Sequence, residues 1–67
     1  MDIRIKFGKR VRKARQNKKL SQEELAYEAD SNRTYISDVE RGTRNPSIEV
    51  VERIARALDV SIGSLLD

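Results

Sequence analysis

The sequence contains no cysteine, no histidine and no tryptophan. The absence of cysteine and histidine excludes disulfide bonds, thiolate nucleophiles, imidazole general bases and the usual zinc ligand sets, on which most enzyme chemistries depend. We therefore expect no enzymatic activity and no metal or cofactor. No apolar run approaches the roughly 20 residues that span a bilayer, and no apolar segment follows the charged N-terminus. These absences predict a cytoplasmic protein with no membrane partner.

Proline and glycine are also scarce, with one proline and three glycines among 67 residues. Pro46 and its polar neighbours mark the only extended break in the chain, and no internal repeat is present. Apolar residues make up 37% of the sequence and charged residues another 37%, a balance that allows a compact core. We expect a single small domain over residues 1–67.

Charge is distributed unevenly along the chain, although the net charge is only +3. Residues 1–19 hold five lysines and four arginines against Asp2 alone, a net of +8, whereas residues 20–67 hold five arginines against ten carboxylates, a net of −5. This asymmetry is typical of a protein that binds nucleic acid, although a solvated helix face would also be rich in lysine and arginine.

Apolar residues recur at three- and four-residue steps in five segments, and no segment shows the strict alternation of a strand. Polar residues suited to helix N-caps precede three of them. Ser21, with Glu24 three residues later, has the pattern of a capping box, and Asn32 and Ser61 are preferred N-cap residues. The sequence predicts an all-α fold of five helices. The apolar stripes are Ile3, Phe7, Val11 and Ala14; Leu25, Ala26 and Ala29; Ile36 and Val39; Ile48, Val51, Ile54, Ala55 and Leu58; and Ile62, Leu65 and Leu66.

Residues 22–41 have the pattern of a helix-turn-helix, with two short helices separated by Asp30, Ser31 and Asn32. This segment, QEELAYEADSNRTYISDVER, resembles the phage-repressor and Cro (XRE-like) family of DNA-binding domains. The resemblance continues through FGKRVRKAR before it and ERGTRNPSIEVVERIARALDVSI after it, so it covers nearly the whole chain. It implies a phage-repressor-like fold and a DNA-binding function.

Two positions of the turn depart from the family pattern. Asp30 stands where the family usually has glycine, and Ser31 stands where it usually buries an apolar side chain. Because aspartate tolerates the left-handed backbone conformation better than most residues, we expect the same turn with reduced stability. The positions where the family has small or apolar residues are otherwise filled by Leu25, Ala26, Ala29, Ile36 and Val39.

The second helix of such a motif reads bases in the major groove with its first turn. Arg33 has the fork geometry for guanine O6 and N7, and the methyl group of Thr34 suits a thymine methyl, each worth roughly 1–3 kcal/mol of discrimination. Taken alone, Arg33 would be an ordinary solvated residue, and it is the surrounding motif that favours base reading. Asp38 would be repelled by phosphates unless it accepts from cytosine N4. The candidate base-reading residues are Asn32, Arg33, Thr34, Tyr35, Ser37 and Asp38.

Residues beside these are candidates for contacts with the DNA backbone. Gln22 stands at a helix start, where free N–H groups favour an anion, and the resemblance implies a phosphate contact there. The alternative for Gln22 is a plain polar residue at a helix start. The loop after the motif is polar and cationic, and the family fold places it beside the backbone. Its candidate residues are Arg41, Thr43, Arg44 and Asn45.

Arg15 and Glu40 each border the apolar stripe of a helix. The resemblance implies that they form a partly buried salt bridge, and removing one partner of such a pair costs about 3–5 kcal/mol. We therefore assign Arg15 a structural role and do not count it as a DNA contact.

The resemblance also implies a homodimer on an inverted-repeat operator, because one recognition helix contacts few bases and paired half-sites about 34 Å apart double that number. Ile62, Leu65 and Leu66 exceed what a small core is expected to bury, and they are the candidates for the dimer interface. The alternative is that they pack within the monomer.

Glu23 lies away from the turn that reads bases. Relatives in the family contact RNA polymerase through an acidic patch when they activate transcription, which makes Glu23, with Glu24 or Glu28, the candidate for such a contact. The alternative is an ordinary exposed helix surface.

Three classes of function follow from these observations. The first is a sequence-specific transcriptional regulator, and RTYIS at 33–37 with Arg44 and Asn45 resembles the restriction–modification controller proteins of bacteria in particular. The second is a protein-interaction module of the same fold, such as an antitoxin or a coactivator-like domain, which Arg33 and Thr34 in the reading turn argue against. The third, an enzyme, is disfavoured by the missing histidine and cysteine.

Overall fold

The computed structural model describes residues 2–67, and Met1, the first residue of the predicted domain, lies outside them. The described residues form five helices and no strand, which confirms the predicted all-α class. The helices are α1 (Ile3–Asn17), α2 (Gln22–Glu28), α3 (Arg33–Arg41), α4 (Ile48–Leu58) and α5 (Ile62–Leu66). Across residues 2–67, no helix has both the length and the apolar character that a membrane crossing requires.

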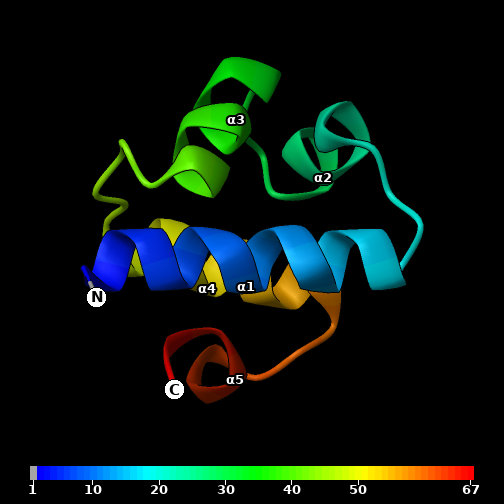
Figure 1. Ribbon diagram of the computed structural model, residues 1–67. Coiled ribbons are helices and arrows are strands. Elements are labelled where there is room, and N and C mark those ends of the chain that lie inside the picture. The colour runs from blue at the N-terminus through cyan, green and yellow to red at the C-terminus, as the bar shows by residue number, and fades with distance from the viewer. Residues whose placement is uncertain (1) are drawn as a thin grey trace.

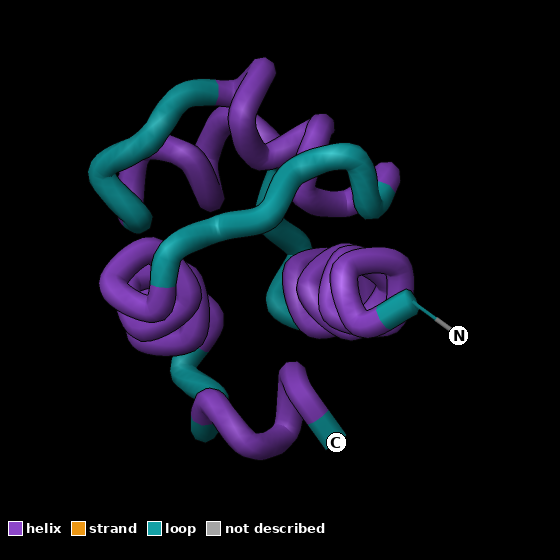
Figure 2. The backbone as a smooth tube through the Cα atoms, turned by 90° about the vertical axis from the view of Figure 1, so that its left-hand side faces the viewer, coloured by secondary structure: helices purple, strands orange, loops and turns teal. Residues whose placement is uncertain are grey.

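The helices are stacked in three layers (Figures 1 and 2). Helices α1 and α4 lie side by side in the middle, α2 and α3 cover them on one side, and α5 lies on the other. Helix α1 packs against α3, α4 and α5, while α2 packs against α3 and α4. The outer faces of α2 and α3 are therefore held away from the rest of the molecule by a packed layer beneath them.

The predicted N-caps are present and explain where three helices begin. The Ser21 hydroxyl accepts from the Glu24 N–H, and the Glu24 carboxylate accepts in return from the Ser21 N–H at 2.8 Å. The hydrogen bond from the Ser21 N–H to the carboxylate, followed by the polar side chain of Ser21, lowers the pKa of Glu24. Asn32 Oδ1 accepts from the Tyr35 N–H at 2.9 Å, and Ser61 Oγ accepts from the Ser64 N–H at 3.1 Å. Each cap satisfies a backbone donor that the helix itself leaves without a partner.

The core contains the apolar residues of the predicted motif and most of the predicted stripes. Ile3 and Ile48 are the most exposed stripe residues, with 55% and 79% of their surface exposed, and Ala14, Ile62 and Leu66 are only partly covered. Ile3 and Ile48 are each the first residue of a helix, where a side chain that points back toward the N-terminus projects beyond the packed turns. The buried apolar residues are Phe7, Val11, Leu25, Ala26, Ala29, Ile36, Val39, Val51, Ile54, Ala55, Ala57, Leu58 and Leu65.

The turn between α2 and α3 has the left-handed residue that the sequence predicts, since Asp30 has φ of 56°. The Ser31 N–H donates to the Ala26 carbonyl at 2.7 Å and the Asp30 N–H to the Tyr27 carbonyl at 3.2 Å, which is the hydrogen-bond pattern of a Schellman motif. That motif is usually accompanied by an apolar contact from the residue at Ser31. Ser31 is half-buried but polar, so the backbone of the turn is complete while this contact is missing.

Helix α5 corrects the prediction that Leu65 lines a dimer interface. Leu65 is 2% exposed and belongs to the core of the monomer, whereas Ile62 is half-buried and Leu66 is 38% exposed. The cause is the way α5 packs across α1, to which Arg10 Nη1 also ties it by donating to the Ser64 carbonyl at 3.1 Å. Only Ile62 and Leu66 of the predicted trio retain surface for a partner.

Candidate nucleic-acid interface

Helix α3 presents four of the six predicted base-reading residues on its outer face. Ile36 and Val39 are buried and anchor the inner face, so the helix is fixed in position and rotation. Arg33 and Thr34, in its first turn, are exposed. Because this turn is part of a helix, it positions its side chains more precisely than a loop does.

A shallow hollow of about 250 Å³ runs along this outer face. It brings together four of the six candidate readers and one candidate backbone contact, so these residues form a single continuous surface. The residues lining it are Arg33, Thr34, Ser37, Asp38 and Arg41.

The other two candidate readers lie beside this hollow and already have intramolecular partners. The side-chain oxygen of Asn32, Oδ1, caps α3. Its side-chain nitrogen, Nδ2, is therefore the group that remains for contact with DNA. Tyr35 is half-buried, and the guanidinium of Arg44 lies over its ring, 4.6 Å from the centroid. A cation at this distance from an aromatic face is attracted to it.

The geometry argues against Asp38 as a reader of cytosine. Its carboxylate forms ion pairs with Arg41, three residues later, and with Arg44 Nη2 at 3.4 Å. A carboxylate that neutralises two guanidinium groups is a weaker acceptor for a base and has fewer free lone pairs to offer it.

The loop after α3 is also held against this helix. Gly42 ends α3 with φ of 78°, a left-handed conformation that suits glycine. The N–H and the hydroxyl of Thr43 both donate to the Asp38 carbonyl, at 3.0 and 3.2 Å. Arg44 therefore starts from a fixed backbone position beside α3.

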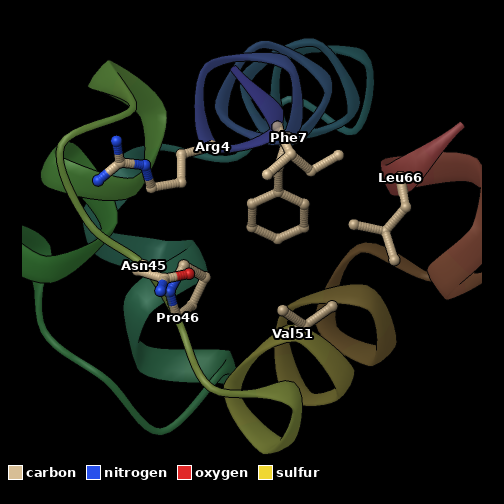
Figure 3. A pocket seen from close by; sticks show the side chains of 7 residues that line it. Arg4, Phe7, Asn45, Pro46, Val51 and Leu66 are labelled. Atoms are coloured by element: carbon tan, nitrogen blue, oxygen red, sulfur yellow. The ribbon is translucent and has the colours of Figure 1, made fainter.

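Asn45 lies apart from the surface of α3. It lines a smaller apolar hollow of about 80 Å³, where the start of α1 meets the loop, α4 and the end of α5 (Figure 3). The structure therefore separates Asn45 from the other residues of the loop that were predicted to contact the DNA backbone. The remaining lining residues are Ile3, Arg4, Phe7, Pro46, Val51 and Leu66.

The predicted ion pair between Arg15 and Glu40 is present and nearly buried. Arg15 Nε donates to Glu40 Oε2 at 2.7 Å and Nη2 to Oε1 at 3.1 Å, and the two side chains are 12% and 4% exposed. The hydrogen bonds to Glu40 raise the pKa of Arg15. Arg15 Nη1 also donates to the Leu20 carbonyl at 2.8 Å, so the pair joins α1, α3 and the loop before α2.

Gln22, predicted to contact a phosphate, is part of the same group in this structure. Its Nε2 donates to Glu40 Oε1 at 3.1 Å, and the side chain is half-buried. The interaction orients the amide at the start of α2 and uses one of its two N–H donors. A phosphate contact at this position therefore depends on the backbone N–H groups of α2 or on the second amide hydrogen.

Comparison with known proteins places this geometry in a family. Residues 11–65 match the helix-turn-helix family model. The chain belongs to this family of DNA-binding transcriptional regulators. It is 54% identical to the control protein C.BamHI of Bacillus amyloliquefaciens, in an alignment that covers 98% of this chain and 83% of the relative.

Solved structures of restriction–modification controller proteins share the fold of this family member. The crystal structure of C.AhdI from Aeromonas hydrophila matches with a TM-score of 0.90 at 44% identity, over 92% of this chain and 90% of that one. C.Esp1396I bound to a 25 base pair operator site matches with a TM-score of 0.84 at 39% identity, over 91% of this chain and 80% of that one.

Sequence reasoning missed two residues that position the helix-turn-helix in this family member. Gly8 lies where α1 approaches the backbone of α3, and a glycine inside an apolar helical stripe was a signal that could have indicated such a contact. Arg53 of α4 donates from Nε to the Ala29 carbonyl at 3.0 Å, at the end of α2. No local pattern marks Arg53, because its partner lies 24 residues earlier in the chain.

Proposed function

We propose that the protein acts as a restriction–modification controller, binding an inverted-repeat operator as a homodimer with one α3 in each half-site's major groove. The observation that carries the proposal is the exposed first turn of α3, with Arg33 and Thr34 on a helix whose other face is buried. The operator complex of C.Esp1396I, at 39% identity, supports it. Such a regulator acts in the bacterial cytoplasm, where the operator DNA is.

The proposed roles follow the positions of the side chains. Arg33 and Thr34 read base edges, with Asn32, Tyr35 and Ser37 beside them. The phosphates are contacted from the start of α2 at Gln22 and from the end of α3 and the loop after it. The residues of this second group, besides Gln22, are Arg41, Thr43 and Arg44, while Asn45 lies apart from them beside the start of α1.

The proposed dimer uses the exposed part of α5. Ile62 and Leu66 are the apolar residues of α5 that keep exposed surface, and α5 lies on the far side of α1 from α3 (Figure 1). For both recognition helices to face one duplex, the twofold axis of the dimer has to run beside α5 and point toward the DNA. Half-sites about 34 Å apart then fall one helical turn from each other on the same face of DNA.

Selection from a random duplex library at roughly 150 mM salt, where unspecific attraction to phosphates is weakened, tests this function. We expect enrichment of an inverted repeat with half-sites one turn apart. Against that operator, Arg33→Ala should bind about 10- to 100-fold more weakly and lose its preference at one base pair of each half-site. The matched control is Arg12→Ala on the exposed face of α1, which removes the same charge and should leave every base preference intact.

Failure to enrich any sequence would contradict the proposal and would favour the protein-interaction module. Enrichment of a single half-site would support base reading by α3 but would contradict the proposed dimer. Loss of the same base preference in Arg12→Ala would mean that Arg33 is not the reader.

We also propose that the outer face of α2 contacts RNA polymerase through Glu23. Glu23, Glu24, Tyr27 and Glu28 line a hollow of about 410 Å³ on this face, and Tyr27 is 86% exposed. Glu23→Lys is expected to lower transcription from an activated promoter while operator affinity stays within about twofold, because only the charge offered to the polymerase is reversed. Reporter transcription and operator binding, measured in parallel, check this. A matching loss of DNA binding would assign Glu23 to the DNA interface instead.

A further inference from the structure

Five residues predicted to contact DNA are linked to one another on the outer face of α3. The carboxylate of Asp38 accepts from Arg41 and, at 3.4 Å, from Arg44 Nη2. Arg44 in turn lies over the ring of Tyr35, and Arg41 Nη1 donates to Ser37 Oγ at 3.3 Å. Asp38 is the only anionic member of this network, and both cations depend on it.

Asp38 presents its charge in the way that a DNA phosphate would. Arginine binds carboxylates and phosphates with the same planar fork of N–H donors. The side chain of Asp38 is 21% exposed, whereas those of Arg41 and Arg44 are 62% and 46% exposed. The two cations thus reach into solvent while their counterion stays closer to the helix.

Ion pairs of this exposure add little to folding stability, and they exchange partners readily. The backbone beside them is secured separately, because Thr43 donates twice to the Asp38 carbonyl and not to its carboxylate. Neutralising the carboxylate therefore releases two guanidinium groups without releasing the loop.

We propose that Asp38 is an intramolecular stand-in for phosphate that holds Arg41 and Arg44 and thereby limits binding to DNA of any sequence. The proposal rests on the proposed function, in which these arginines contact the DNA backbone. On any duplex each arginine has to exchange a carboxylate for a phosphate, so the gain from unspecific contact is reduced. Because the operator adds base contacts to these phosphate contacts, it can stay bound while contact with phosphates alone becomes weaker.

Asp38→Asn tests the proposal, with Asp30→Asn as the matched control. Both variants remove one carboxylate from the helix-turn-helix, but exposed Asp30 lies outside the network, and asparagine also tolerates its left-handed backbone. On a random-sequence duplex, Asp38→Asn should bind roughly three- to tenfold more tightly, and its plot of log affinity against log salt should be steeper by about 0.9. Asp30→Asn should change both quantities by clearly less.

Two readouts separate this role from the alternatives. If Asp38 reads cytosine, Asp38→Asn binds the operator more weakly and loses its preference at one base pair. That result would overturn the proposal. Unchanged or weaker binding to random duplex would overturn it as well. If the wild-type protein selects no operator, the proposed function fails, while the random-duplex measurement still reports on Asp38.

The effect of Asp38 on the position of Arg44 can also be measured without DNA. The protein has two tyrosines and no tryptophan, so in a Tyr27→Phe background the tyrosine fluorescence comes from Tyr35 alone. Adding Asp38→Asn should free Arg44 from the Tyr35 ring and increase quenching by acrylamide. Equal quenching with and without the Asp38 carboxylate would show that Asp38 does not position Arg44.

Discussion

Gly8→Ala is expected to lower the free energy of unfolding by about 3 kcal/mol or more. A Cβ at Gly8 would meet the carbonyl oxygen of Val39 in severe overlap and that of Glu40 at 2.8 Å. Both are backbone atoms of α3, which cannot move aside as the end of a flexible side chain can. The gain in helix propensity from alanine, about 1 kcal/mol, is too small to offset this overlap.

Gly63→Ala is the matched control for this substitution. A Cβ there meets only Asp67 Oδ2, at the ordinary distance of 3.7 Å, so the same change in α5 should be neutral or slightly stabilising. Urea unfolding followed by circular dichroism measures both variants. A domain of this size has a total stability of roughly 3–10 kcal/mol, so Gly8→Ala should lose about a third of it or more and unfold at a clearly lower urea concentration. Equal stability of the two variants would contradict the close approach of α1 to α3.

Arg15→Met is expected to cost about 3–5 kcal/mol, because it leaves the 4% exposed carboxylate of Glu40 buried without its cation. Gln22 then remains as its hydrogen-bond donor, through one amide hydrogen at 3.1 Å. Glu40→Leu should cost somewhat less, since Arg15 is more exposed and keeps the Leu20 carbonyl as an acceptor at 2.8 Å. The difference between the two single variants follows from which charge is the more deeply buried.

The double variant Arg15→Met with Glu40→Leu provides the control. A buried ion pair replaced by apolar residues of similar volume is often neutral, so the double variant should recover most of the stability that either single variant loses. The measurement is again urea unfolding, analysed as a double-mutant cycle. Losses below about 1 kcal/mol in both single variants would mean that the pair behaves as an exposed one.

The helix caps and the turn at Asp30 could be predicted from short stretches of sequence. Ser21, Asn32 and Ser61 were predictable as caps, because an N-cap bonds to a backbone group only two or three residues away. Asp30 was predictable as the left-handed residue for a similar reason, since the turn is closed by hydrogen bonds within six residues. Such interactions are complete within one segment of sequence.

The stripe pattern was less informative at the ends of helices. Periodicity correctly placed Phe7 and Val51 in the core, but it placed Ile3 and Ile48 there as well. A repeat of apolar residues indicates which face of a helix is turned inward. It does not indicate how far along that face a neighbouring helix extends, and this length decides whether the first side chain is covered.

The sequence by itself determined the helical class, the caps, the helix-turn-helix and the residues on the outer face of α3, because each depends on residues close together in the chain. The tertiary structure decided that Leu65 is covered while Leu66 is exposed, and that Gly8 meets the backbone of α3. It also decided that Asp38 holds an arginine of the following loop. These contacts depend on how separate segments pack and turn against one another, and that arrangement is set by the combined packing of all five helices.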